Sequence, residues 1–421
     1  MMDELVIPGL DGYENALLNQ NLQQLAGTIM INRTRKNYLE AQQKVQKLGI
    51  AIPPSLSNFE AALSWPYKSV KSLANRIKLT GFAMPGEDLE AYDIHRIWAD
   101  NQLSIEASHA HKSALSYGVS FLAAMAGDEG LGEPPAIIRT LSPLTTTATW
   151  SKNLRRATSG VSVVSTEDAY PTELIFFMED VVLTLKYQAG RWVIDEAPTL
   201  GHCPLHVLAY DSSPEYPFGR SRVTQGVMKI TDEAIRTTLR MEISAEFFSA
   251  PQRYLLGAEE EAFTDADGNV KTGWEAVIGR LLAIPADEDG NKPEVGQFAQ
   301  HAMTPHSDHF KLIAAKFSGE TNIPVNALGI IHENPASDAA MHTAYLDLNA
   351  DAESAHDPFG FAWVGAMKDA VEIRGTGTIE ADYLNGEIIR LDGASTPLLH
   401  AVDAGAPDSM SNGMRRRVWH I

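Results

Sequence analysis

Three histidines and an aspartate close together in the sequence have side chains that can bind a metal ion. His301, His306 and His309 lie near Asp308, and His306 and His309 are three residues apart, a spacing that two ligands on one helix can use. No HExxH pattern or comparable carboxylate spacing accompanies them. We therefore interpret them as structural or surface histidines, and the sequence predicts neither a metal site nor a cofactor.

The sequence contains neither a complete calcium-binding loop nor a nucleotide-binding P-loop. The stretch DADGNVKTGWE, which begins at Asp265, is similar to a calcium loop, but Gly268 and Glu275 each stand one or two positions too early for that loop. This spacing favours a β-turn. No GxxxxGK[ST] motif is present, so no P-loop ATP site is expected.

The sequence also lacks the patterns of nucleophilic catalysis. The single cysteine, Cys203, lies in GHCPLH between two histidines, but no recognised catalytic signature surrounds it and no GxSxG elbow is present. We interpret Cys203 as a small buried hydrophobic residue. One cysteine also excludes an intrachain disulfide and any metal cluster built from cysteines.

Length and charge limit the class of protein. A chain of 421 residues with 44% hydrophobic content is expected to hold two or three globular domains. The 54 acidic and 34 basic residues give a net charge of −20, which opposes tight, static binding to nucleic acid. No run of apolar residues is long enough to span a bilayer, and the acidic start is unlike a signal peptide, so we expect neither a membrane span nor secretion.

The longest predicted helix lies between Tyr216 and Pro251. Ser221 can cap its start, Pro251 cannot continue it, and about 30 residues without proline correspond to about 45 Å. Two apolar lines run along this stretch, separated by a polar line of Gln225, Lys229, Asp232, Arg236, Arg240 and Ser244. A helix that is apolar on two sides is expected to pack against neighbours on both.

The charges near the ends of this helix oppose its dipole. Arg220 and Arg222 lie near the N-terminus and Glu242 and Glu246 near the C-terminus, and each such placement costs about 0.3–1 kcal/mol unless it is compensated. Our hypothesis is that copies of this helix, or partner segments, supply the missing counter-charges. The alternative is an ordinary buried helix with solvated ends.

Periodicity predicts an α+β chain with helices at both ends of a β-rich region. In the first half of the chain we expect helices over 5–48 and 88–117, strands over 76–84 and 119–126, and one antiparallel sheet from six short runs between 135 and 207. After Pro251 we expect a small β-rich module, a helix that begins at Thr304 and Pro305, and an extended loop over 321–337. A third long helix is expected from Ser337, with a break at Pro358 and Gly360, and a strand in EIIRLDG. We expect the sheet to pack on the N-terminal helices.

This order of elements resembles a known family. The stretches that carry the resemblance are ADNQLSIEASHAHKSALSYG at 99–118, PFGRSRVTQGV, APQRYLLG, GETNIPVNALGI and NPASDAAM. Together they are similar to the portal, or head-to-tail connector, proteins of tailed double-stranded-DNA phages, most closely those of siphophages that infect actinobacteria.

The resemblance implies a subunit with a helical and β wing, long stem helices, a small β-rich clip and a tunnel loop. The expected divisions are wing 1–218, first stem helix 219–250, clip 251–303, second stem helix 304–320, tunnel loop 321–337, and a wing and crown helix with the C-terminal segment at 338–421. The end of the chain is shorter and richer in turns than this pattern, so we expect a reduced crown.

The resemblance also implies partners and a place in the virion. It implies a ring, usually of twelve subunits, at one capsid vertex, assembled in the host cytoplasm, through which double-stranded DNA passes without sequence specificity during packaging and ejection. The expected partners are the terminase large subunit, a head-tail connector or adaptor, and the major capsid and scaffold proteins. No enzymatic activity is expected.

Site residues are expected on the tunnel loop and on the first stem helix. The residues expected to face DNA are Asn326, His332, Glu333, Asn334, Lys229, Arg236 and Arg240, and those expected to pack between subunits are Val223, Val227, Ile230, Met241, Phe247 and Phe248. Because Lys and Arg are absent from 321–337, contacts of that loop with a moving duplex would be transient.

Two alternatives stay open at this point. Another capsid or head-tail structural component would share the acidic composition and the lack of catalytic motifs. A soluble hydrolase would require a convergent acid/base or metal site, which the sequence does not display.

Overall fold

The computed structural model describes residues 4–43, 61–83, 89–168, 170–248, 253–256, 294–297, 302–330, 343–379 and 385–390. The chain divides into two units. Unit 1 consists of residues 1–44, 62–232 and 314–421, and unit 2 consists of residues 45–61 and 233–313. Each unit is considered by itself below.

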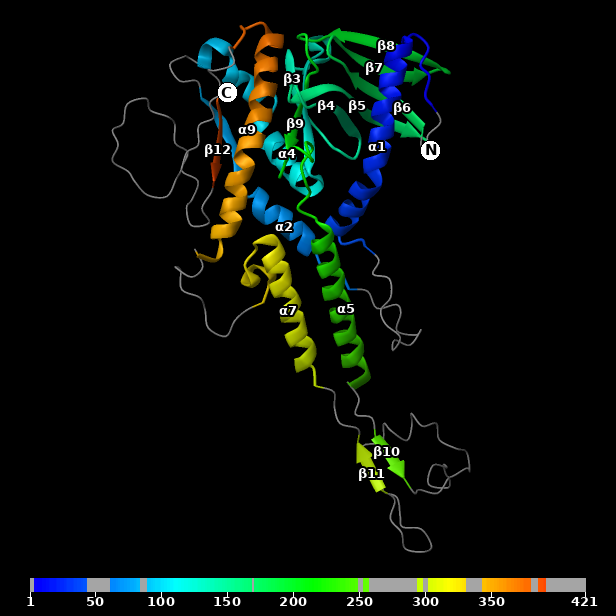
Figure 1. Cartoon of the computed structure of the whole chain (residues 1–421), viewed down its shortest axis with the longest axis vertical. Helices are drawn as coiled ribbons and strands as arrows, with labels where there is room; N and C mark the ends of the chain where they lie inside the picture. The colour runs from blue at the N-terminus through cyan, green and yellow to red at the C-terminus, as the bar shows by residue number, and fades with distance from the viewer. Residues whose placement is uncertain are drawn as a thin grey trace, which may run out of the picture. The chain divides into compact units, whose positions relative to one another are not determined.

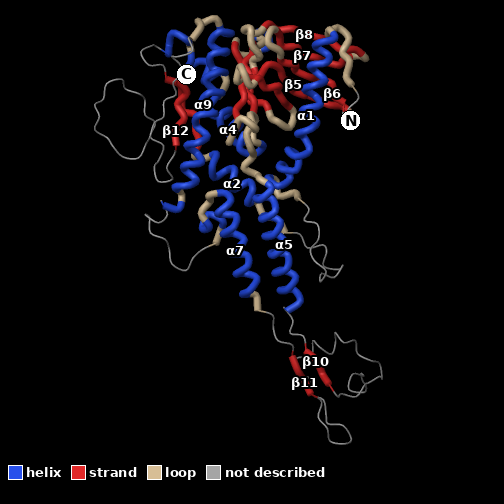
Figure 2. Tube along the Cα trace, viewed as in Figure 1, coloured by secondary structure: helices blue, strands red, loops and turns tan. Residues whose placement is uncertain are grey.

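The described elements mix helices with antiparallel sheets, which confirms the α+β class (Figures 1 and 2). The α-helices are α1 (Gly12–Leu39), α2 (Trp65–Ala74), α3 (Ile94–Asp100), α4 (Leu103–Tyr117), α5 (Gln225–Phe248), α7 (Thr304–Thr321) and α9 (Leu346–Arg374), with short 3-10 turns η2 (Leu89–Tyr92), η3 (Glu129–Leu131) and η5 (Val325–Leu328). The strands are β1 (Ile77–Ala83), β2 (Val119–Ala126), β3 (Ala136–Leu141), β4 (Thr146–Ser151), β5 (Arg156–Glu167), β6 (Tyr170–Phe177), β7 (Val181–Gln188), β8 (Arg191–Pro198), β9 (Leu205–Ala209), β10 (Arg253–Leu256), β11 (Glu294–Gln297) and β12 (Asn385–Arg390).

The predicted single sheet between 135 and 207 is in fact two sheets. Strands β4 to β8 form a five-stranded antiparallel meander, whereas β3 pairs with β2, which in turn pairs with β9. The chain turns between β3 and β4, where the amide of Thr146 donates to the carbonyl of Ser142. The sheets meet closely at Gly160, where an added Cβ would lie 2.4 Å from Leu205 Cδ1, so β5 needs a residue without a side chain at this point.

Helix α1 covers one face of the five-stranded sheet, as predicted. Its residues Leu18 and Leu22 share a buried cluster with Val161, Leu174 and Phe176 of that sheet. The helix begins with a capping box, in which Asp11 accepts from the amide of Glu14 and Glu14 accepts from the amide of Asp11. The helix ends at Leu39, whereas the sequence predicted helix up to residue 48. Residues 44–48 lie outside the described residues, so that part of the prediction stays a prediction.

The predicted break in the third long helix is wrong, because α9 continues through Pro358. Proline inside a helix removes one hydrogen bond and costs about 3 kcal/mol or more. Phe359 and Trp363, both fully buried, lie just beyond it, and burying two such side chains offsets a cost of that size. Helix α9 packs against β2 and β9, and Figure 1 shows it beside β9.

The predicted helix over 88–117 is divided into η2, α3 and α4. Asp93 and Gln102, which precede α3 and α4, both have positive φ values, 54° and 48°. Such left-handed residues end one helix and redirect the chain into the next. By contrast, the predicted strands β1 and β2 occur as expected, and β1 pairs with β12 from the EIIRLDG stretch.

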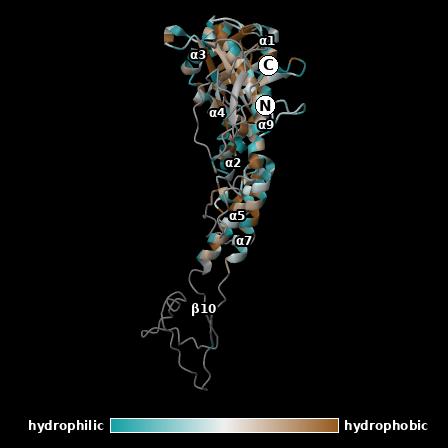
Figure 3. Cartoon of the chain, turned by 90° about the vertical axis from the view of Figure 1, so that its left-hand side faces the viewer, coloured by the Kyte–Doolittle hydropathy of each residue, from teal (hydrophilic) through white to brown (hydrophobic). Residues whose placement is uncertain are grey.

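Helix α5 is shorter than predicted. It starts at Gln225 and has 24 residues, which corresponds to about 36 Å. Thr224 rather than Ser221 caps it, because the Thr224 hydroxyl accepts from the amide of Val227. Ser221 holds the preceding turn: its hydroxyl donates to the carbonyl of Ser116 and accepts from the amide of Val223. Hydrophobic and hydrophilic residues alternate along α5 in Figure 3.

In unit 2 the described strands β10 and β11 form an antiparallel pair, from Arg253 opposite Gln297 to Leu256 opposite Glu294. This pairing agrees with β structure in the predicted module, whose other residues between 257 and 293 lie outside the described part of the chain. None of the described helices combines the length and the apolar character that crossing a bilayer requires.

Candidate functional site

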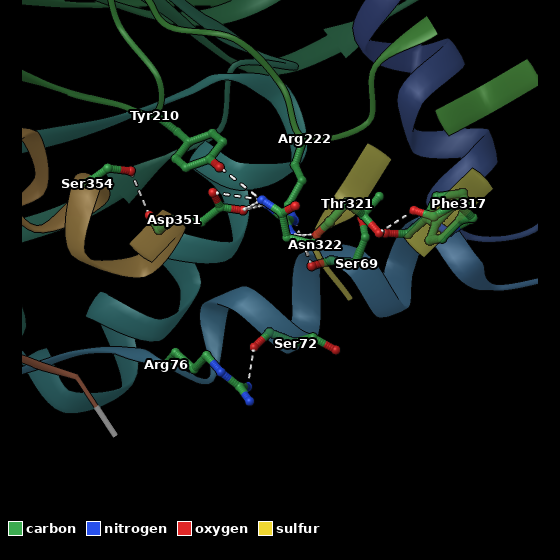
Figure 4. Close-up of polar contacts among 11 residues, drawn as sticks. Ser69, Ser72, Arg76, Tyr210, Arg222, Phe317, Thr321, Asn322, Asp351 and Ser354 are labelled. Atoms are coloured by element: carbon green, nitrogen blue, oxygen red, sulfur yellow. Dashed lines mark hydrogen bonds and ion pairs between the residues drawn. The ribbon is translucent and has the colours of Figure 1, made fainter. Parts of the chain in front are cut away.

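The start of α5 and the end of α7 are fixed to each other and to unit 1 by one buried arginine. Arg222 is 7% exposed, and its guanidinium donates to the Ser69 carbonyl at 3.1 Å, the Tyr210 hydroxyl at 3.3 Å, the Asp351 carboxylate at 3.0 Å and the Thr321 carbonyl. We call Ser69, Tyr210, Arg222, Thr321, Asn322 and Asp351 the helix-root cluster (Figure 4).

Each partner of Arg222 comes from a different segment. Ser69 lies in α2, Tyr210 follows β9, Thr321 ends α7 and Asp351 lies in the first part of α9. Asn322, which has a positive φ of 54°, donates from its amide to both Asp351 carboxylate oxygens at 3.2 and 3.1 Å. Five donors in a rigid plane allow one arginine to bind several acceptors, so the root of both helices is held by one side chain.

The counter-charge of Arg222 therefore comes from another segment of its own chain, which corrects the hypothesis of compensation by copies of the helix for this residue; for Glu242 and Glu246 the hypothesis stays a prediction. Asp351 pairs with Arg222 in a site where both side chains are largely removed from water. Arg220 also has local partners, the Tyr216 ring at 4.3 Å and Asp211 at 3.7 Å. Because α5 begins only at Gln225, neither arginine lies within its first turn, and the expected conflict with the dipole is small.

Apolar packing and one hydroxyl reinforce the same root. Phe317 of α7 is fully buried and its ring lies 5.1 Å from the Trp65 ring of α2. The Thr224 hydroxyl donates to the Glu320 carboxylate at 2.9 Å, which joins the start of α5 to the last turn of α7. Gly226 leaves room for this carboxylate, since an added Cβ would lie 2.5 Å from Glu320 Oε1.

Of the residues expected to face DNA, three lie on α5, one lies in the turn η5 and three lie outside the described residues. Lys229 in unit 1 is exposed, and in unit 2 Arg240 is exposed and Arg236 half-buried, all on the polar line of α5. Asn326 is exposed in the turn η5. His332, Glu333 and Asn334 lie outside the described residues, so their predicted position stays a prediction.

The residues expected to pack between subunits differ in exposure. Val223 and Val227 are fully buried within unit 1, while Ile230 and Met241 are half-buried. The side chains of Phe247 and Phe248 lie outside the described set, although the backbone of α5 continues through them. Contact with a neighbouring subunit stays a prediction for all six.

Among the described residues, His306 and His309 do not belong to a group of side chains that could hold a metal ion. His309 of α7 lies 3.6 Å from the Glu233 carboxylate of α5 within unit 2, and Asp308 pairs with Lys311 at 3.3 Å. His301 is outside the described residues. The exposed position of His309 agrees with a surface role in holding α5 beside α7.

A second polar group, which the sequence reading did not assign, lies between the sheet and α9. His202 and His206 both direct Nε2 at the Asp369 carboxylate of α9, at 3.0 Å and 2.8 Å. The hydrogen bond to Asp369 raises the pKa of His202 although burial opposes it. Burial alone would raise the pKa of Asp369, but the charge of His206 and both hydrogen bonds outweigh burial and lower it to about 2.

The sequence signal for this group was the pair of histidines in GHCPLH. Asp369 lies more than 160 residues away in sequence, so periodicity could not connect it to them. Cys203 between the histidines is buried, as predicted, and burial raises the pKa of its thiol to about 12, which leaves it protonated and unreactive at neutral pH.

The buried His111 lies in a separate hydrogen-bond network. The Trp363 indole donates to its Nε2 at 3.1 Å, so the ring proton is on Nδ1, which donates to the Ile77 carbonyl at 3.2 Å. Its ring stacks on Phe359 at 4.9 Å. Burial lowers the pKa of His111 to about 4, with a smaller opposing effect of the Ile77 carbonyl. The neutral ring therefore joins α4, β1 and α9.

This network predicts a stability that falls in mild acid. The folded pKa of His111 lies below its unfolded value, so the unfolded state binds the proton first, and stability is lost as pH falls from about 6.5 towards 4. Between pH 7.5 and 5 the loss is about 2 kcal/mol. Urea unfolding at both pH values should show this loss in the wild type and a smaller one in His111→Gln. An equal pH dependence in wild type and variant would contradict the assignment, and His109→Gln, at an exposed position, is the control.

Comparison with known proteins adds a relationship in sequence. The chain is 26% identical over 390 residues to the portal protein of Mycobacterium phage D29, covering 90% of this chain and 79% of that protein. It is 25% identical over 384 residues to the portal protein of Mycobacterium phage L5, covering 90% and 78%. No protein-family model matches the chain.

Two solved structures that align with part of the chain are particle necks. The neck of a native GTA particle, computed with C12 symmetry, aligns with a TM-score of 0.42 and 13% identity over 77% of this chain and 83% of that chain. The neck of an empty GTA particle, computed with C6 symmetry, aligns with a TM-score of 0.42 and 14% identity over 76% and 83%.

Proposed function

We propose that the chain, which is similar over most of its length to two mycobacteriophage portal proteins, acts as a phage portal protein: it forms a closed ring at one capsid vertex and conducts double-stranded DNA through the centre. The observation that carries this proposal is the similarity over 90% of the chain to two proteins named portal protein. The ring, of twelve subunits, acts as a structural conduit of the virion and not as an enzyme.

The helix pair supports a stem in this ring. A heterologous contact that closes on itself makes a ring, and such a contact joins two different surfaces of each subunit, which a helix with two apolar sides can supply. The half-buried Ile230 and Met241 of α5 are available for a neighbouring copy, while Val227 of α5 and Val223 just before it are buried inside their own chain. The helix-root cluster then fixes where each stem leaves the wing.

The charge of the chain supports a conduit that does not hold its cargo. A net charge of −20 repels the DNA backbone, and each neutralised phosphate would add salt-dependent affinity. The cationic residues Lys229, Arg236 and Arg240 form a single line on α5. We propose that they, with Asn326 and the loop residues His332, Glu333 and Asn334, make transient contacts with the moving duplex.

The finer divisions follow the family pattern. We propose a wing at 1–218, stem helices at 219–250 and 304–320, a clip at 251–303, a tunnel loop at 321–337, and a wing and reduced crown at 338–421. The β10 and β11 pair supports β structure in the clip. In this scheme the clip binds the terminase large subunit during packaging and the head-tail connector afterwards, and the wing contacts capsid and scaffold proteins during assembly in the host cytoplasm.

The ring is tested first by mass. Light scattering of the purified chain, followed by negative-stain images, should show a closed ring with a central hole close to the width of a DNA duplex. If the chain is a monomer alone, it should assemble when it is co-expressed with capsid and scaffold proteins. A monomer under both conditions would contradict the proposal.

The tunnel loop gives a separate prediction. Deleting residues 331–335 should leave ring assembly unchanged and impair DNA packaging or retention, because the contacts with the duplex are lost while the stem is intact. Ring formation is measured by light scattering and packaged DNA by nuclease protection in assembled heads. Normal packaging by the deletion variant would contradict the assignment of this loop to the channel.

A further inference from the structure

The group of His202, His206 and Asp369 has the composition of a transition-metal site. Two imidazole nitrogens and one carboxylate oxygen are the donors that zinc and similar divalent ions prefer, whereas calcium and magnesium prefer oxygen donors alone. The three ligand atoms lie within 4.8 Å of one another. They come from the loop before β9, from β9 itself and from α9, so an ion here would join the three-stranded sheet to that helix.

The two separations between histidine nitrogens and the aspartate are close to those around a bound ion. His202 Nε2 and His206 Nε2 lie 3.0 and 2.8 Å from Asp369 oxygens. Donors at about 2.0–2.1 Å from a tetrahedral zinc are about 3.3 Å from each other. Outward shifts of a few tenths of an ångström would therefore admit the ion, which would replace the protons now shared between the imidazoles and the carboxylate.

The backbone places the ligands. Asp369 is 5% exposed, and the hydrogen bonds recorded for its carboxylate come from the two histidines. Gly365, one turn earlier on α9, leaves space for the His206 ring, because an added Cβ would lie 2.4 Å from His206 Nδ1. Gly365 thus leaves space for the His206 ring, and the Asp369 carboxylate accepts a hydrogen bond from its Nε2. Together they orient Nε2 of His206 towards Asp369.

The group also has an open side. His202 and Asp369 line a pocket of about 1030 Å³ that continues past Pro204 and Ile373 towards β7 and β8. Zinc sites with three protein ligands complete a tetrahedron with water. The pocket can supply that water and a path for the ion.

We propose that His202 Nε2, His206 Nε2 and Asp369 bind one zinc-like divalent ion, with water from the pocket as the fourth ligand. The ion acts as a structural clamp between the sheet and α9. This inference does not depend on the proposed ring or on contact with DNA.

The test is a zinc titration of the full chain without an affinity tag. The protein is treated with EDTA, dialysed into metal-free buffer at pH 7.5, and titrated with zinc sulfate in a calorimeter. We expect one zinc per chain, no comparable binding of magnesium chloride, and a rise of at least about 3 °C in the thermal midpoint at saturating zinc.

Variants assign the ion to this group. His202→Gln and Asp369→Asn should each weaken zinc binding at least about tenfold, with folding checked by circular dichroism. His202 is the safer position because it is partly exposed. The matched control is His309→Gln, which alters the other histidine group and should bind zinc as the wild type does. No zinc binding by the wild type, unchanged binding by folded His202→Gln, or loss of binding in His309→Gln instead would overturn the proposal.

Discussion

Replacing Arg222 with methionine is expected to lower the free energy of unfolding by about 3–5 kcal/mol. The substitution removes the four hydrogen bonds of the guanidinium and leaves the Asp351 carboxylate with a reduced set of partners in a largely buried site. The Ser69 and Thr321 carbonyls lose their guanidinium donors as well. The Asp351 carboxylate keeps the hydrogen bonds from Asn322 but loses its counter-charge, and this loss accounts for most of the cost, because methionine fills similar volume without supplying a donor. Urea unfolding at pH 7.5 measures the change.

The control for this prediction is two residues away. Arg220→Met removes an exposed arginine whose ion pair with Asp211 is 3.7 Å long, and exposed pairs contribute about 0–1 kcal/mol. The double variant Arg222→Met/Asp351→Asn should recover part of the loss, since it also removes the unpaired charge. If Arg220→Met destabilised the chain as much as Arg222→Met, the helix-root cluster would not have the role assigned to it.

The same cluster links stability to function. In the proposed ring, each subunit must direct its proposed stem helices in one way, and Arg222 connects the approach to α5, the end of α7 and the start of α9 within unit 1. We therefore expect Arg222→Lys, which keeps the charge and loses the planar fork, to remain folded but to form rings with lower yield in light scattering.

Replacing Gly219 with alanine is the second change with a large expected effect, above about 3 kcal/mol. Gly219 has a φ of +68°, and an added Cβ would lie 2.1 Å from the Tyr210 carbonyl and 2.6 Å from the Gly118 carbonyl. Both neighbours are backbone atoms held by other bonds, since Tyr210 donates to Gly118 at 2.8 Å and Arg220 donates to Tyr210 at 2.7 Å. The clash must therefore break a junction that joins the ends of α4 and β9 to the approach to α5.

Gly190 provides the matched control, because both glycines have a positive φ but only Gly219 has neighbouring atoms close to an added Cβ. Its φ is +80°, and nothing lies within 4 Å of an added Cβ. Gly190→Ala should therefore cost only the left-handed strain of about 1–2 kcal/mol. Thermal unfolding of both variants separates strain from clash, and equal midpoints would show that the close approach at Gly219 carries no extra cost.

Elements with local sequence signals occur where the sequence predicts them. A strand was predicted over VSFLAAMA and β2 has these bounds, and the Thr304 and Pro305 pair marked the start of α7. These signals depend on residues within a few positions of one another, so the chain carries them without reference to the fold. The predicted break at Pro358 was wrong because burial of Phe359 and Trp363 in the tertiary structure outweighs a local rule.

The sequence by itself determined the class of the chain and its relationship: a strongly acidic, mixed α and β protein with a long amphipathic helix and an order of motifs similar to phage portal proteins. Only the tertiary structure decided which distant residues meet. Arg222 and Asp351 are 129 positions apart, and His202 and Asp369 are 167 positions apart. Periodicity indicates which face of a helix or strand is apolar, but it does not indicate which other element packs against that face. The pairing of buried charges depends on which elements pack together, so only the tertiary structure shows it.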